Sequence, residues 1–156
     1  MTPRMRARRH EDGASAVEFA LLFTFVLAPL LFGLIQYGMY FYATNAASSA
    51  AREALRRAVV GDCQTDTEVT TLVKNQTQGA AEDDSDSPTT GTIEYLDPGT
   101  ENVITDPEVG DEVRITVELK AMGVGAFIPQ PHGGNITREA VGRLEDLEKL
   151  SATACQ

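Results

Sequence analysis

Glu18 is the single acidic residue in a long apolar stretch near the N-terminus. Between residues 19 and 35 only Thr24 is polar. A carboxylate at the edge of a membrane segment is costly unless it is paired or reaches water, so an acid in this position indicates a function. Glu18 is therefore expected either to lie at the headgroup level, where water solvates it, or to find a cationic partner.

Gly13, five residues before Glu18, indicates where such a cation could arise. Cleavage after Gly13 would make Ala14 the first residue of the mature chain and Glu18 the fifth. The freed α-amine of Ala14 in one subunit could then pair with Glu18 of a neighbour in an apolar bundle. An unpaired buried charge is strongly destabilising, so each subunit would find its counter-ion on the next.

The residues around this acid resemble a known family. The pattern G-x-x-x-x-E-F at the start of an apolar helix looks like a type IV prepilin processing site. The string SAVEFALL, the later proline and the motif G-x-I-x-x-G (Gly33, Ile35, Gly38) are similar to the TadE-like pseudopilins of the tight-adherence (Flp, type IV) pilus system. The similarity extends over about residues 12–57 and includes AAREALR at residues 50–56.

Two positions depart from the pattern of that family. The proline expected nearer the glutamate lies at Pro29, and Gln36 stands where an acid is common. Neither position touches the processing site. Both leave open whether the chain is TadE-like or TadF-like.

The resemblance implies a pseudopilin or minor pilin that works within a pilus machine. It implies that a prepilin peptidase cuts the precursor after Gly13, that Glu18 pairs with the Ala14 amine, and that Phe19 begins the bundle-forming surface. The implied partners are other pilins or pseudopilins, in a homo- or hetero-oligomer, and an inner-membrane assembly platform. The implied role is surface adhesion or biofilm formation, at the bacterial cytoplasmic (inner) membrane and, after processing, at the cell surface.

Charge and hydropathy predict the orientation of the chain and its domains. Residues 1–13 hold four arginines and two acids, a charge of +2, so the remainder carries −12 of the formal net charge of −10. An excess of Lys and Arg marks the cytoplasmic flank, which places the N-terminus inside and the acidic bulk outside. The apolar run is long enough to cross a hydrocarbon layer about 30 Å thick. We expect a leader at residues 1–13, the transmembrane part of a long helix at 14–42, its exported amphipathic half at 43–61 and a small extracytoplasmic α/β head at 62–156.

Two other classes of protein remain open from the sequence. One is a single-pass binding protein held by an uncleaved signal anchor, with no role in a filament. The other is a secreted soluble module released by cleavage near Ala43 or Ala47. An ordinary secretory signal has an apolar region of about 7–15 residues, and the apolar run here is longer.

The exported half of the helix carries a face of small side chains. Ala43, Ala47, Ala51, Leu55 and Val59 recur at every fourth residue. This spacing produces one helical face. Such a face either lets a neighbouring helix approach closely or packs on the protein's own head.

Local signals predict where the helices are disturbed and where they end. Pro29 should kink the long helix, because proline lacks a backbone N–H and crowds the preceding turn. Gly61 should end that helix in the left-handed C′ position. Residues 65–78 are a candidate second helix with Thr65 or Asp66 as its N-cap.

The remaining pattern predicts a small antiparallel sheet. Residues 92–96 and 112–120 are predicted strands, and the second alternates as a half-buried antiparallel strand does. Residues 136–150 fit a strand followed by a short helix, and the resemblance implies a last strand near residues 136–145. The exported half of the long helix is expected to cover the apolar face of the sheet. The predicted fold class is therefore α+β, with a long N-terminal helix on a small sheet in a pilin-like layout.

Cys63 and Cys155 are the two cysteines of the chain. An even pair in an exported domain is typical of a disulfide, which here would tie the end of the long helix to the C-terminus. Closing a loop of about 90 residues would stabilise the fold by about 4–5 kcal/mol in the chain-entropy model. Two unpaired thiols are the alternative.

The sequence shows no arrangement of residues typical of catalysis. His10 falls in the expected leader and His132 in a Gly/Pro-rich segment, so neither is placed beside a nucleophile and an acid. Two cysteines without nearby histidines supply too few metal ligands. The acidic composition argues against binding of nucleic acid. We expect no enzymatic activity, no cofactor and no metal.

Overall fold

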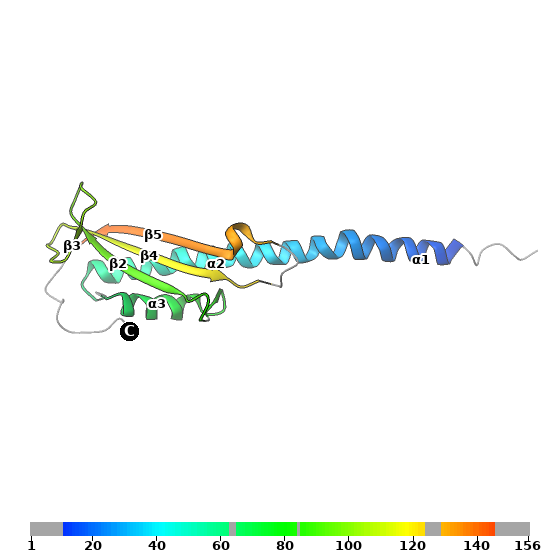
Figure 1. Cartoon of the computed structure of the whole chain (residues 1–156), viewed down its shortest axis with the longest axis horizontal. Helices are drawn as coiled ribbons and strands as arrows, with labels where there is room; N and C mark the ends of the chain where they lie inside the picture. The colour runs from blue at the N-terminus through cyan, green and yellow to red at the C-terminus, as the bar shows by residue number, and fades with distance from the viewer. Residues whose placement is uncertain (1–10, 63–64, 84, 124–128, 146–156) are drawn as a thin grey trace, which may run out of the picture.

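A long helical rod with a small head at one end makes up the part of the chain that the computed structural model describes, residues 11–62, 65–83, 85–123 and 129–145 (Figure 1). The rod consists of α1 (Glu11–Leu22), a π-helical turn η1 (Phe23–Leu27) and α2 (Ala28–Val59). At about 1.5 Å per residue this continuous helix is roughly 70 Å long.

The head consists of a short helix and an antiparallel sheet. After α3 (Asp66–Thr77) the strands are β1 (Ala81–Glu82), β2 (Thr90–Leu96), β3 (Val103–Ile104), β4 (Glu112–Ala121) and β5 (Asn135–Arg143), with a 3₁₀ turn η2 (Pro131–Gly134) before the last. β4 is central, because β5 pairs with it on one side and β2 and β1 pair with it on the other, while β3 extends the sheet beyond β2. The predicted α+β class is therefore confirmed.

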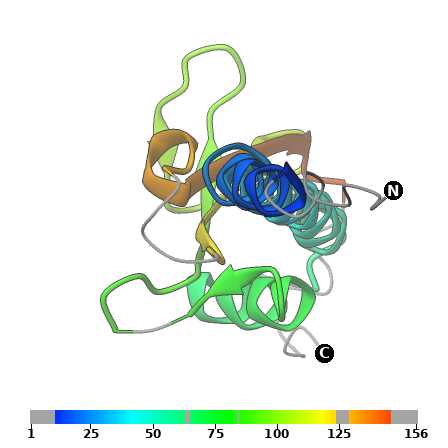
Figure 2. The same ribbon diagram turned by 90° about the vertical axis from the view of Figure 1, so that its right-hand side faces the viewer.

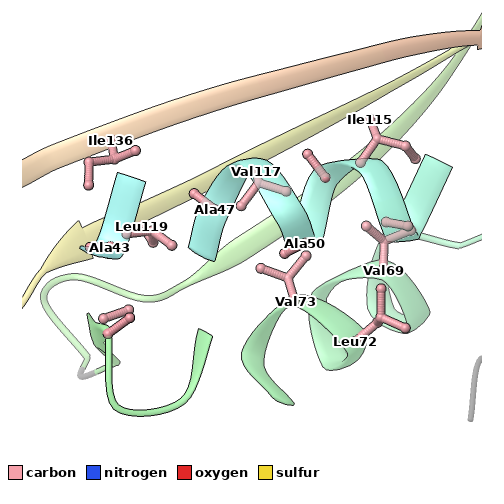
Figure 3. Close-up of a cluster of buried hydrophobic side chains, with 14 of the residues drawn as sticks. Ala43, Ala47, Ala50, Val69, Leu72, Val73, Ile115, Val117, Leu119 and Ile136 are labelled. Carbon is pink, nitrogen blue, oxygen red and sulfur yellow. The ribbon is translucent and has the colours of Figure 1, made fainter. Parts of the chain in front are cut away.

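The core lies between the distal half of α2, α3 and one face of the sheet (Figures 2 and 3). The predicted alternation of β4 is confirmed, since Val113, Ile115 and Val117 are fully buried while the residues between them are only partly buried. In the β2–β4 register Ile93 stands opposite Ile115. Figure 3 shows side chains of β4 gathered in one cluster with Ala47 and Ala50 of α2 and with Val69 and Val73 of α3. The small alanine side chains let the helix lie close against the sheet.

The structure contains both predicted helix-terminus signals: Gly61 follows the last turn of α2, and Thr65 precedes the first turn of α3. Gly61 has φ +78°, its N–H donates to Ala58 O at 3.0 Å and the N–H of Asp62 donates to Arg57 O at 2.9 Å. These two bonds form a Schellman motif, which satisfies carbonyls that the end of a helix leaves free. At the start of α3 the Thr65 side chain accepts from the backbone of Glu68 and the Glu68 side chain accepts in return, which is a capping box.

Helix α3 covers the outer edge of β2 through side chains one turn apart. Asp66 Oδ1 accepts from Ile93 N at 2.8 Å, and Thr70 Oγ1 bonds both Gly91 N (3.0 Å) and Gly91 O (2.9 Å). Four helical residues rise about 6 Å and two strand residues about 6.6 Å, so the two series stay in step. The groups that an edge strand normally leaves unpaired are thus bonded to a helix.

Gly91 is required by this close approach of α3 to β2. A Cβ added at this position would lie 2.7 Å from Val69 Cγ1 and 3.1 Å from Val73 Cγ2. Real Cβ atoms essentially never lie within 3.0 Å of another atom, so a larger residue would push the helix off the strand edge. The absence of a side chain at one strand position therefore permits the hydrogen bonds of Thr70.

Some elements differ from the prediction. The rod begins at Glu11, so the last residues of the expected leader already belong to the helix. The two-residue strands β1 and β3 were not predicted. The last strand ends at Arg143, close to the end that the family resemblance implied, and the short helix expected after it falls largely outside the described residues.

Candidate functional site

The residues of the predicted processing site lie on the part of the rod that the head does not cover. Gly13, Ala14, Glu18 and Phe19 belong to α1, and all are exposed, Phe19 to 67 %. Within the described part of the chain Glu18 makes no ion pair. The head leaves this end of the helix uncovered, so any partner of the Glu18 carboxylate must come from outside the described fold.

Ala14 and Glu18 are four residues apart on one helix and therefore lie on the same face, one turn apart. Cleavage after Gly13 would place a new ammonium group on that face beside the carboxylate. Glu18 would also lie in the second turn of the mature helix, close to the positive end of its dipole. A neighbouring rod would thus meet a positive and a negative group side by side.

A wide helical turn interrupts the rod directly before Pro29. Over η1 the hydrogen bonds take the π pattern, and Ala28 N donates to Phe23 O. Proline has no N–H to donate and its ring crowds the carbonyl four residues earlier, so the preceding turn widens. Thr24 Oγ1 donates to Ala20 O at 2.8 Å in the same region. The disturbance that the sequence predicts at Pro29 therefore begins one turn before it.

The head begins to cover the helix at Gln36. This side chain is only 3 % exposed, whereas residues 29–32, 34 and 35 are exposed. A Cβ on Gly123 would lie 3.1 Å from Gln36 Nε2 and 3.2 Å from the side-chain amide of Gln130. Gln130 Nε2 in turn donates to Met122 O at 3.0 Å. The departure from the family pattern at Gln36 is thus the point where the membrane-side end of the head rests on the rod.

The face of small residues packs on the protein's own head. Ala43 and Ala47 have no exposed surface and Ala51 is 1 % exposed. Leu55 is half-buried and lies against β5, where a Cβ on Gly142 would be 3.2 Å from its methyl groups. Val59 is also half-buried. Of the two uses that the sequence left open, the structure supports packing within the subunit.

An ion-pair cluster that the sequence did not predict lies near the distal end of α2. Arg56 Nη2 and Arg57 Nε contact Glu53 Oε1 at 2.8 and 2.9 Å. The hydrogen bond from Arg56, followed by that from Arg57, lowers the pKa of Glu53 to about 2. The spacing of these residues at i+3 and i+4 could have revealed the pairs, since such residues are neighbours on a helix.

The predicted disulfide cannot be placed on this fold, because Cys63 and Cys155 both lie outside the described residues. Their pairing stays a prediction. His10 lies outside them too, while His132 occupies η2 with φ +51°. Within the described residues no group of three or more His, Cys, Asp or Glu side chains is placed to hold a metal ion.

The fold defines the class of protein to which the chain belongs. One helix, over Gly13–Val59, is long and apolar enough to cross a membrane, and its most apolar window is wholly outside the core. It indicates a single-pass membrane anchor that carries a small α+β head. The model of the TadE-like protein family matches residues 13–56, so this stretch is TadE-like and the predicted resemblance is confirmed there. No curated protein and no solved structure matches the chain.

Proposed function

We propose that this chain is the precursor of a pseudopilin or minor pilin of a tight-adherence pilus. A prepilin peptidase would cut it after Gly13, and the mature subunit would join a filament or its initiating complex through the N-terminal part of its rod. Adhesion to surfaces or biofilm formation would follow from pilus assembly. The chain would be a substrate of the peptidase and a structural subunit rather than an enzyme.

One observation carries the proposal. The apolar rod over residues 13–35 is left almost entirely exposed by the head, and its one acid lies near the residue at which the TadE-like match begins. A water-soluble protein rarely exposes so large an apolar surface, so this part of the rod needs a membrane or neighbouring helices. A filament core of packed helices would supply the same environment after extraction from the membrane.

The proposed charge pair would fix the position of one rod along its neighbour. Glu18 in an apolar surrounding needs a counter-ion, and the α-amine of Ala14 would be created only by processing. Pairing between neighbours would therefore occur only among processed subunits. Phe19 and the apolar residues that follow would form the contacts of the bundle.

The proposed orientation follows from the arginines of residues 1–13, which favour a cytoplasmic N-terminus in the inner membrane. The head would then be extracytoplasmic, in a compartment that permits the Cys63–Cys155 disulfide. A companion pilin and a membrane assembly platform would be the partners of the rod.

The two other classes of protein, a secreted module and a signal-anchored binding protein, predict different N-termini for the mature chain. Release by cleavage near Ala43 or Ala47 would remove residues that have no exposed surface in the core of the head. A permanently uncleaved anchor would leave Glu18 without the α-amine. The buried positions of Ala43 and Ala47 disfavour the secreted module. The N-terminus of the mature chain distinguishes an uncleaved anchor from a processed pilin.

N-terminal sequencing of the protein from its native membrane tests the proposal. We expect the mature chain to begin at Ala14, and the variant Gly13→Leu to keep its leader. The matched variant Gly33→Leu, at a helical glycine where an added Cβ meets nothing within 4 Å, should be processed normally. A mature chain that begins at residue 1 or beyond Ala43 would overturn the proposal.

A further inference from the structure

The outer stripe of α2 is the helix face turned away from the head. It consists of Gly38, Phe41, Tyr42, Asn45, Ser49, Arg52 and Arg56, and every one of these residues is exposed. The opposite face holds the buried alanines and packs on β4, β5 and α3 (Figure 2). The outer stripe continues directly from the exposed part of the rod, and it changes from aromatic to basic over about 22 Å.

Packing within the subunit does not require a glycine at Gly38. A Cβ added there would meet nothing within 4 Å, and its backbone is helical. A glycine inside a helix costs about 1 kcal/mol relative to alanine. Phe41 and Tyr42, each 60 % exposed, flank the gap that it leaves. Such a notch between large side chains suits close approach by another surface.

The distal end of the stripe is basic, although the chain has a formal net charge of −10. Arg52 makes no ion pair within the described residues, and the side chain of Arg56 remains 71 % exposed while it contacts Glu53. Arg52 and Arg56 are the two charged side chains of the stripe, and both are arginines. A partner of this surface should therefore carry negative charge.

The 97–111 loop, which connects β2 to β4 and contains the two-residue strand β3, supplies that charge on the same molecule. Residues 97–111 contain five acids and no lysine or arginine. The acids are Asp97, Glu101, Asp106, Glu108 and Asp111. Val103 and Val109 in this loop are 64 % and 60 % exposed, so the loop also offers apolar contact.

The basic end of the outer stripe and the 97–111 loop lie at the same end of the head. Figure 1 shows the β3 region at the end of the head farthest from α1, which is also where α2 ends. The loop projects from the sheet away from α2 when the molecule is viewed along the rod (Figure 2). Subunits anchored in one membrane stand parallel, so the loop of one copy can reach the outer stripe of the next.

We propose that the outer stripe of α2 binds the 97–111 loop of a second copy of this chain. The two surfaces differ, so the contact is heterologous. In a pair of copies, one outer stripe and one 97–111 loop remain unoccupied. Contacts of this kind build rings or open helical arrays rather than closed dimers. The inference deepens the proposed function, on which it rests for the parallel arrangement of the subunits.

Photo-crosslinking of the full chain in detergent micelles tests this contact. A photoreactive residue at Ser49, in a mixture of isotope-labelled and unlabelled chains, should yield a crosslink between two copies that maps to residues 97–111. The double variant Arg52→Glu/Arg56→Glu should lower the yield about tenfold, and so should Asp106→Lys/Glu108→Lys. Mixing these two variants should restore it, since the charges are then exchanged.

A matched variant separates the contact from general effects of charge. Arg143→Glu reverses one charge in the same direction at an exposed position of β5 and should leave the yield unchanged. Crosslinks that map elsewhere, or a mixture of exchanged variants that does not recover, would overturn the inference. The test uses unprocessed chain, so it can fail while N-terminal processing is confirmed, and the reverse.

Discussion

At the scale of single residues, Glu18 decides whether the rod is only an anchor or also an assembly element. The carboxylate is exposed on α1 and has no ion-pair partner in the described fold. A membrane anchor alone would tolerate or prefer a neutral side chain here, because an ionised group in an apolar layer is costly. An acid at this position needs an opposite charge, which a processed neighbouring subunit would supply.

The variant Glu18→Gln should therefore insert normally and assemble poorly. Loss of one member of a buried pair costs about 3–5 kcal/mol, which corresponds to at least a hundredfold weaker association. Co-purification of a tagged with an untagged copy from solubilised membranes measures this association. The control Glu139→Gln, an exposed acid on β5, should behave as the wild type. Equal co-purification of Glu18→Gln would contradict the pairing.

A second acid, Glu53, gives the head a dependence on pH. Its pKa is lowered from 4.5 to about 2, first by the hydrogen bond from Arg56 and then by that from Arg57. A carboxyl group with a lowered folded-state pKa stabilises the fold above its unfolded pKa, and this stability is lost as the pH falls through the folded pKa. Glu53→Gln should thus lower the free energy of unfolding at pH 7 by about 1 kcal/mol after allowance for solvent screening. Chemical denaturation of both proteins should show the difference shrinking between about pH 4.5 and pH 2, and a constant difference would refute the assignment.

At the scale of elements, the sequence predicted the features that depend on residues close together in the chain. Thr65 as the cap of α3, Gly61 as the end of α2 and the alternation of β4 depend on neighbouring residues, and all three are confirmed. The bonds of Asp66 and Thr70 to β2 join residues that are 27 and 21 positions apart, and no local pattern encodes them. The use of the alanine face also depended on the rest of the fold. For this reason the sequence left two alternatives open.

The bonds between α3 and β2 lead to a prediction for Thr70. Thr70→Val keeps the shape of the side chain and removes the hydroxyl that bonds Gly91 N and Gly91 O. Two partly buried backbone groups would lose their partner, so the head should be destabilised by about 1–2 kcal/mol. Thr71→Val, at an exposed hydroxyl that bonds only its own helix at Thr67 O, is the matched control and should change little. Equal stability of the two variants in thermal unfolding would show that β2 does not need this cover.

At the scale of the whole molecule, Gln36 marks the boundary between the exposed part of the rod and the part that the head covers. The apolar run and Glu18 identified the membrane part of the rod, and the TadE-like match covers it together with the alanine face of α2. The sequence placed the boundary of the exported half at residue 43, whereas the head covers one side of the helix from Gln36 onward. Hydropathy does not reveal this because Tyr37, Phe41 and Tyr42 remain exposed beside the covered face. Aromatic residues of this kind favour the interface between membrane and water.

Truncation at this boundary should separate the two parts. Residues 13–35 bury no side chain in the core, so a chain that begins at Gln36 should fold into the same head without detergent. A chain that begins at Ser49 would lack Ala43 and Ala47, whose fully buried side chains pack against the sheet, and should lose about 2–5 kcal/mol or fail to fold. Circular dichroism during thermal unfolding distinguishes the outcomes. If the chain from Gln36 does not fold, the rod before it contributes to the stability of the head, and the division of the molecule into anchor and head is wrong.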